Sequence, residues 1–176
     1  MLGAADAALL LAKSHGRDRV CLYTEAQAGF ASELEGDLVA VGRRFAAFIG
    51  LDEAETAGLV TALAVHETGG AVQDEVQAIL GSGKNGDVRP TEVRRSAVDA
   101  LVYGNERWDG SGYPEGRRGS AIPRVARAYA VCARYEVVVH NGSTVEELRD
   151  VAAKELDPAM VQRFTAMLRA DKAAHN

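Results

Sequence analysis

The sequence ERWDGSGYP occupies residues 106–114 and interrupts an otherwise helical pattern. It contains the only tryptophan of the chain, Trp108, and two glycines that permit turns disfavoured by other residues. Pro114 restricts the preceding Tyr113 to extended backbone conformations. Two interpretations are open. The stretch is either a tight connection between helices in which Trp108 fills the core, or a functional loop, because loops often carry function.

Helical patterns lie on both sides of this loop. Apolar residues at helical spacing predict helices over residues 34–49, 52–66, 76–80, 90–102, 122–135 and 158–168, with Phe48 in the first apolar stripe. Capping pairs are expected at three helix starts: Asp52 with Glu55, Ser143 with Glu146, and Asp157 with Pro158. We therefore predict an all-α domain of six or seven helices around one core.

Composition narrows the class of protein. The chain has 176 residues, 47% apolar content and a net charge of −5, which suit one globular domain and argue against a nucleic-acid partner. No apolar run approaches the roughly 20 residues that span a bilayer, so no membrane segment is expected. Cys21 and Cys132 are isolated, which is typical of a cytoplasmic protein with free thiols.

Residues 1–23 have a different pattern from the rest. They predict an Ala-rich helix followed by one short strand, which is too little to form a domain. The run ADAAL with the later AKSHGRDRV resembles the last helix and strand of the GGDEF diguanylate cyclase domain. This resemblance implies a GGDEF remnant at 1–23, a linker at 24–33 and a helical domain at 34–176. The alternative is a generic Ala-rich helix. A homodimer through this helix is also expected to be possible, because 23 residues cannot bury their own apolar face.

Two places in the sequence could carry metal chemistry. His66 and Glu67 are adjacent on a predicted helix, where they could bind one ion or span two, although an inward histidine is more often a core residue. Glu106 and Asp109 follow the helix that ends near Val102, but no histidine accompanies them. A two-metal hydrolytic centre needs several converging imidazoles and carboxylates. With four histidines in the chain, composition points away from such a centre.

The loop string ERWDGSGYPEG, followed by Gly119, Ile122-Pro123 and Ala126-Arg127, resembles the HD-GYP domain over roughly residues 34–170. Members of that family resemble HD phosphohydrolases and hydrolyse cyclic di-GMP, a bacterial signalling molecule, at an iron or manganese centre. They are often joined to GGDEF domains. The resemblance implies an HD-domain-like helical bundle and a role in signal transduction.

The sequence departs from the family pattern at the metal ligands. It has His66-Glu67 where the family has His-Asp, and Gly104-Asn105 where the family has paired histidines. Two later aspartates of the family align with Ala133 and Glu136. We therefore expect a degenerate domain with no catalytic residues and no metal cofactor, in which His66 and Glu67 are relics.

The leading hypothesis is a regulatory module that docks a GGDEF domain in cis or in trans. The expected interaction loop consists of Glu106, Arg107, Trp108, Asp109, Gly110, Gly112, Tyr113 and Pro114. A first alternative is a receptor that binds cyclic di-GMP without hydrolysing it. The phosphates of this ligand would contact Arg118 and Arg127. A second alternative is residual metal-dependent phosphodiesterase activity through His66, Glu67 and Glu106.

Overall fold

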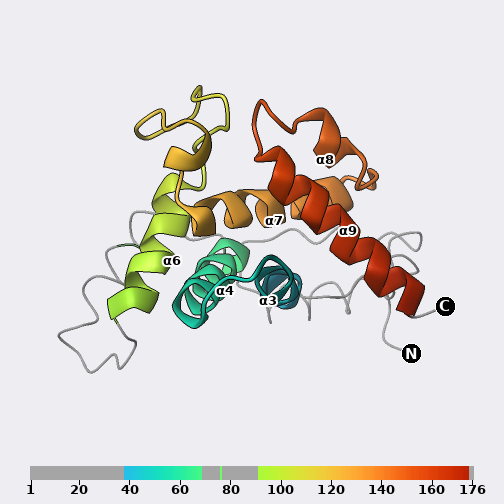
Figure 1. The fold of residues 1–176 in the computed structure, drawn as a ribbon, viewed down its shortest axis with the longest axis horizontal. Coiled ribbons are helices and arrows are strands. Elements are labelled where there is room, and N and C mark those ends of the chain that lie inside the picture. Colours follow the sequence, from blue (N-terminus) through green and yellow to red (C-terminus); the bar gives the residue numbers. More distant parts are fainter. Residues whose placement is uncertain (1–37, 69–75, 77–90, 175–176) are drawn as a thin grey trace, which may run out of the picture. The chain divides into compact units, whose positions relative to one another are not determined.

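A computed structural model describes residues 38–68, 76 and 91–174 (Figure 1). Its helices are α3 (Leu38–Ile49), α4 (Glu53–Thr68), α6 (Thr91–Tyr103), the short 3₁₀ helix η2 (Gly119–Ala121), α7 (Arg124–His140), α8 (Glu147–Asp150) and α9 (Pro158–Ala174). The described part thus holds six α-helices and no named strand, which confirms the predicted all-α class. The predicted remnant at 1–23, the linker at 24–33 and nearly all of the helix at 76–80 lie outside the described residues.

Helix α7 is the centre of the core, because it packs against each of the other five α-helices of the described part. Its buried face includes Tyr129, Cys132 and Tyr135. Aromatic rings tie neighbouring helices together: Phe164 of α9 lies 4.9 Å from Phe45 of α3 and 5.1 Å from Tyr135, ring centre to ring centre. Such edge contacts add to the stabilisation from burial.

Two of the three predicted capping pairs are confirmed. The Asp52 carboxylate accepts from the Glu55 backbone N–H at 2.8 Å, and the Glu55 carboxylate accepts from the Asp52 N–H at 3.1 Å. At the start of α9 the Asp157 carboxylate accepts the N–H groups of Ala159 and Met160 at 2.8 and 3.3 Å. Both pairs satisfy N–H groups that a helix start leaves without intrahelical partners.

Two predictions about side chains were wrong. Glu146 caps no helix through its side chain, and it pairs instead with Arg169 of α9 at 3.6 Å. Phe48 is 49% exposed, because it lies beside the α3 stripe that buries Phe45 and Ile49.

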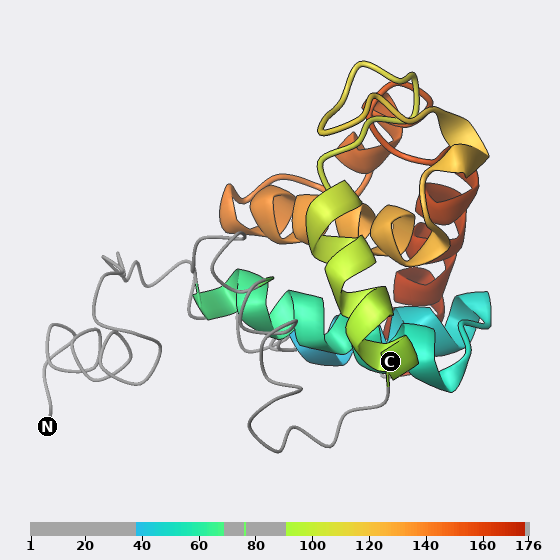
Figure 2. The same cartoon turned by 90° about the vertical axis from the view of Figure 1, so that its left-hand side faces the viewer.

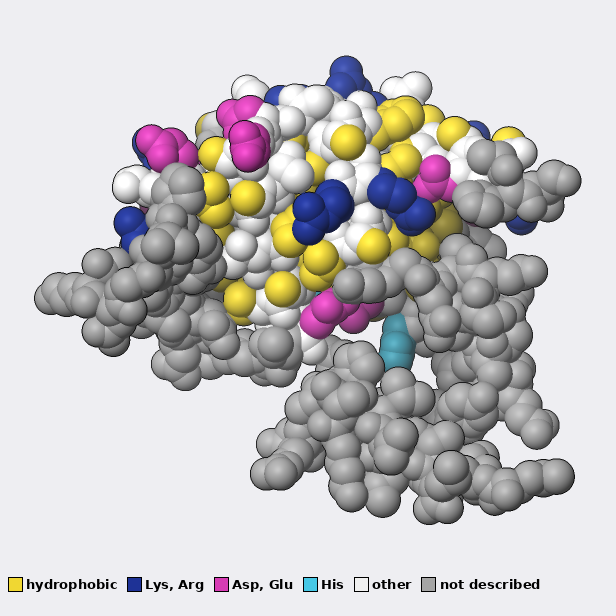
Figure 3. Space-filling view, turned by 90° about the horizontal axis from the view of Figure 1, so that it is seen from below, with side chains coloured by type: hydrophobic (Ala, Val, Ile, Leu, Met, Phe, Trp, Pro, Cys, Tyr) yellow, Lys and Arg dark blue, Asp and Glu magenta, His cyan; other side chains and the backbone are white. Residues whose placement is uncertain are grey.

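The long connection from α6 to α7 and the connection from α8 to α9 lie together at one end of the bundle (Figures 1 and 2). On the described part of the face seen in Figure 3, hydrophobic side chains alternate with separate basic and acidic ones. No helix among the described residues is long and apolar enough to cross a bilayer. The predicted interaction loop at residues 106–114 belongs to the α6–α7 connection.

Candidate functional site

Glu106 organises the loop from within. Its side chain is only 4% exposed, and its two carboxylate oxygens accept the backbone N–H groups of Glu115 at 2.8 Å and Arg117 at 3.0 Å. Gly112 passes so close that an added Cβ would lie 2.2 Å from the Arg107 nitrogen. Both carboxylate oxygens of Glu106 therefore hold the loop closed, which is a structural task and not metal binding.

The loop is fixed to the α8–α9 connection through its backbone. The N–H of Trp108 donates to the carbonyl of Glu155 at 3.1 Å, and the N–H of Asp109 donates to that of Lys154 at 3.0 Å. The Arg107 guanidinium adds an ion pair with the Glu155 carboxylate at 3.4 Å. These bonds join two segments far apart in sequence into one rigid end of the bundle.

Trp108 supports this end from inside. It is half-buried, and its carbonyl accepts the N–H of Gly119 at 3.0 Å. The Arg127 guanidinium lies 5.9 Å from the centre of the Trp108 ring and pairs with the buried Asp157 carboxylate at 2.7 Å. The packing interpretation of Trp108 is therefore the better one.

Tyr113 is the part of the loop that faces solvent. Its side chain is 64% exposed, and the adjoining Pro114 is exposed as well. The Asp109 carboxylate accepts the side-chain hydroxyl and the backbone N–H of Ser111, and these hydrogen bonds lower the pKa of Asp109. An aromatic ring is thus presented on a loop whose backbone is held from both sides.

A second cluster, around Tyr103, lies at the base of the loop. The Arg117 guanidinium lies 3.9 Å above the centre of the Tyr103 ring, donates to the Tyr103 hydroxyl, and pairs with the Glu115 carboxylate at 2.9 Å. The hydrogen bond from Arg117 is the main cause of a lowered Glu115 pKa. No periodic pattern in the sequence indicates this cluster, because it depends on the loop folding back onto the end of α6.

His66 lies at the face of α4 that meets α7. Its Nε2 lies 2.9 Å from a Glu136 carboxylate oxygen, and its Nδ1 lies 2.9 Å from the Tyr129 hydroxyl. In the neutral ring, an Nε2–H donates to Glu136 and Nδ1 accepts from Tyr129. Burial, with a smaller contribution from the Glu136 charge, raises the pKa of Tyr129 to about 12, so its hydroxyl keeps the donated proton. Both ring nitrogens of His66 are therefore occupied by protein groups.

The residues around His66 do not fit an iron or manganese centre. A Cβ added at Gly104 would lie 2.5 Å from the Tyr129 ring, so a histidine at this position would collide with it. Ala133 offers no ligand atom, and the Glu67 carboxylate accepts the backbone N–H of Leu38 at the start of α3. No group of three or more His, Cys, Asp or Glu side chains within residues 38–68 and 91–174 could hold a metal ion.

The two predicted phosphate contacts lie in different surroundings. Arg118 is exposed and packs beside Gly110, whereas Arg127 is engaged with Asp157 and the Ile122 carbonyl. The structure thus brings the predicted loop residues together as one unit. The sequence analysis did not identify Tyr129 as a partner of His66. The available signal was Gly104, because a glycine where a large residue is expected leaves space for another side chain, here the ring of Tyr129.

Comparisons with known proteins give a structural match. No protein-family profile and no curated protein sequence matches this chain. One solved structure, a cyclic GMP-AMP specific phosphodiesterase of V. cholerae, is similar in fold, with a TM-score of 0.55 and 15% sequence identity. The match covers 76% of this chain and 43% of that structure, so this chain spans less than half of its length. The fold is an HD-domain-like helical bundle.

Proposed function

We propose that this chain is a non-catalytic, HD-GYP-like module of cyclic-dinucleotide signalling that docks a GGDEF domain through its loop at residues 106–114. The observation that carries the proposal is the environment of His66. In place of ligands, Tyr129 and Glu136 occupy both nitrogens of its ring. A phosphodiesterase fold whose ligand position is filled by a tyrosine side chain lacks the means to activate water on a metal.

The shape of the loop supports docking. Glu106 and the α8–α9 connection fix its backbone, so binding would require little ordering of the chain. The exposed Tyr113 ring offers apolar area and a hydroxyl, a combination enriched at interface hot spots. The resemblance of residues 1–23 to the end of a GGDEF domain names the partner class, and the V. cholerae phosphodiesterase supports cyclic-dinucleotide signalling as the setting.

Binding of a purified GGDEF domain to the full chain tests the docking. We expect Tyr113→Ala to weaken the complex by about 30-fold, as is typical of an aromatic hot spot of about 2 kcal/mol. Phe48→Ala is the matched control, because Phe48 is also an exposed aromatic but lies on α3. Equal affinities of the parent and Tyr113→Ala would refute the loop as the interface.

A separate assay tests the absence of catalysis. The protein is incubated with Mn²⁺ or with Fe²⁺ under anaerobic conditions, then assayed for bound metal and for hydrolysis of cyclic di-GMP and cyclic GMP-AMP. We expect substoichiometric metal and no turnover. Stoichiometric metal with turnover that is lost in His66→Ala would show residual phosphodiesterase activity and overturn the proposal, whatever the docking result.

A further inference from the structure

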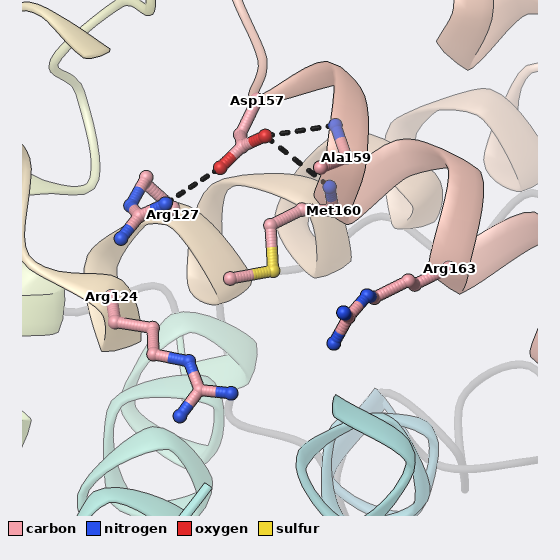
Figure 4. A pocket seen from close by; sticks show the side chains of 6 residues that line it. All are labelled: Arg124, Arg127, Asp157, Ala159, Met160 and Arg163. Carbon is pink, nitrogen blue, oxygen red and sulfur yellow. Dashed lines mark hydrogen bonds and ion pairs between the residues drawn. The ribbon is translucent and has the colours of Figure 1, made fainter. Parts of the chain in front are cut away.

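A pocket of about 240 Å³ lies where the first turns of α7 and α9 meet (Figure 4). Arg124 and Arg127 line it from α7, and Arg163 lines it from α9. Asp157, the remaining charged residue of the lining, stands at the start of α9. The lining therefore carries three positive charges and one negative charge, a net charge of +2 in a chain of −5.

Two of these arginines are fixed in place by other groups. Arg127 donates to the Asp157 carboxylate and, through Nε, to the Ile122 carbonyl at 3.1 Å. Arg124 donates to the backbone carbonyls of Gly50 and Ile49 at the end of α3, with the Glu55 carboxylate 3.8 Å away. Each guanidinium carries five N–H donors, so each keeps donors for a ligand after these bonds.

Arg163 differs from the other two. It has no hydrogen-bond or ion-pair partner among the described residues, yet its guanidinium points into the pocket in Figure 4. Asp157 does not compensate it, because that carboxylate already binds Arg127 and caps α9. Arg127 and Arg124 already lie beside the carboxylates of Asp157 and Glu55, so the exposed Arg163 is the charge of the lining that an anion would pair with.

The pocket is separate from the His66 site. Arg124 and Arg127 precede Tyr129 by five and two residues, which places them about 140° and 160° around α7 from it. Glu136 follows Tyr129 by seven residues and returns to within about 20° of the same side. The two sites therefore lie on opposite sides of the central helix.

We propose that this pocket binds a small phosphate-bearing anion, with Arg163 as the residue that closes on it. Guanidinium groups match the paired oxygens of inorganic phosphate or a phosphate monoester, and the surroundings stay net positive when Glu55 beside Arg124 is counted. The volume is below the roughly 300–1,000 Å³ of sites for drug-sized ligands, so a whole cyclic dinucleotide would not be enclosed.

Calorimetric titration of the full chain tests this site with three probes: inorganic phosphate, adenosine monophosphate and cyclic di-GMP. We expect phosphate or the monophosphate to bind at one site per chain, and Arg163→Gln to weaken that binding at least tenfold. Arg169→Gln is the matched control, because Arg169 lies on α9 but pairs with Glu146 outside the pocket. Preference for the monophosphate over phosphate would assign a phosphate monoester, and the reverse would assign the free ion.

Thermal unfolding distinguishes a loss of phosphate binding from a loss of protein stability. Without ligand, Arg163→Gln should unfold at or above the melting temperature of the parent, because the substitution removes a charge that has no partner. Phosphate should raise the melting temperature of the parent and of Arg169→Gln more than that of Arg163→Gln. No binding of phosphate or monophosphate, or equal binding by parent and Arg163→Gln, would overturn the proposal.

Discussion

Glu106 shows how one buried carboxylate can hold a long loop. Each of its oxygens accepts a backbone N–H from the far side of the loop. Glutamine at this position has one acceptor oxygen, and its amide group would face the second N–H. We expect Glu106→Gln to lower the free energy of unfolding by about 2 kcal/mol, the cost of a buried group left without its partner. Urea denaturation measures this, with Glu147→Gln at an exposed position of α8 as the neutral control.

A substitution at Ala153 should change the free energy of unfolding in the opposite direction. It adopts a φ of 68°, in the left-handed region, within the connection that holds the loop. A residue with a Cβ pays about 1–2 kcal/mol there, and glycine avoids this cost while losing about 0.5–1 kcal/mol through greater freedom in the unfolded chain. We expect Ala153→Gly to stabilise the protein by roughly 0.5 kcal/mol.

The control for that substitution is Ala166→Gly, at an exposed position inside α9. Glycine inside a helix destabilises it by about 1 kcal/mol. The two variants should therefore shift the midpoint of urea unfolding in opposite directions, and a loss of stability in both would contradict the strain assigned to Ala153.

At the scale of elements, Asp157 joins the start of α9 to α7. One oxygen caps α9 and the other pairs with Arg127. Asparagine preserves the cap but not the charge, whereas alanine removes both. We expect Asp157→Ala to cost at least about 3 kcal/mol, because it leaves the largely buried Arg127 charge unpaired, and Asp157→Asn to cost less. In an Arg127→Gln background the cost of Asp157→Asn should shrink; an unchanged cost would show that the ion pair contributes nothing.

The elements themselves could be predicted largely from local sequence. The Asp52–Glu55 pair and the Asp157-Pro158 step act over a few residues, so their patterns predicted helix starts that the structure confirms. The Ser143–Glu146 pair failed because α8 begins at Glu147, which places Glu146 at the N-cap, and its side chain lies near Arg169 of α9. Local patterns are sufficient until a tertiary contact competes for the same group.

The surroundings of the sites were less predictable for the same reason. Tyr129 lies 63 residues from His66 and was expected only as a core residue. Arg163 reaches the pocket of Arg124 through the packing of α9 on α7, which no spacing in the sequence reveals. The resemblance predicted that metal ligands are absent, and the structure adds that the Tyr129 hydroxyl lies 2.9 Å from Nδ1 of His66.

At the scale of the whole molecule, α7 buries three groups that resist ionisation, Cys132, Tyr129 and Tyr135, and the first two have the largest pKa shifts. Burial raises the pKa of the Cys132 thiol to about 12 from 9.0, and burial together with Glu136 raises that of Tyr129 to about 12 from 10.0. In the unfolded chain both groups lose their protons at lower pH than in the folded protein. Their contribution to stability is therefore complete below about pH 9 and is lost as pH rises toward 12.

Unfolding by urea at pH values from 7 to 11 tests this coupling in a Cys21→Ser background, which leaves Cys132 as the single thiol. We expect the free energy of unfolding to be flat near neutrality and to fall above pH 9, at about 1.4 kcal/mol per pH unit for each titrating group. Cys132→Ala loses stability at every pH through its cavity, but its curve should fall less steeply between pH 9 and 10. Tyr129→Phe should reduce the slope only above pH 10, because the pKa of tyrosine in the unfolded chain is higher than that of cysteine. Identical slopes in the Cys21→Ser parent, Cys132→Ala and Tyr129→Phe would mean that burial in the core raises the pKa of neither group.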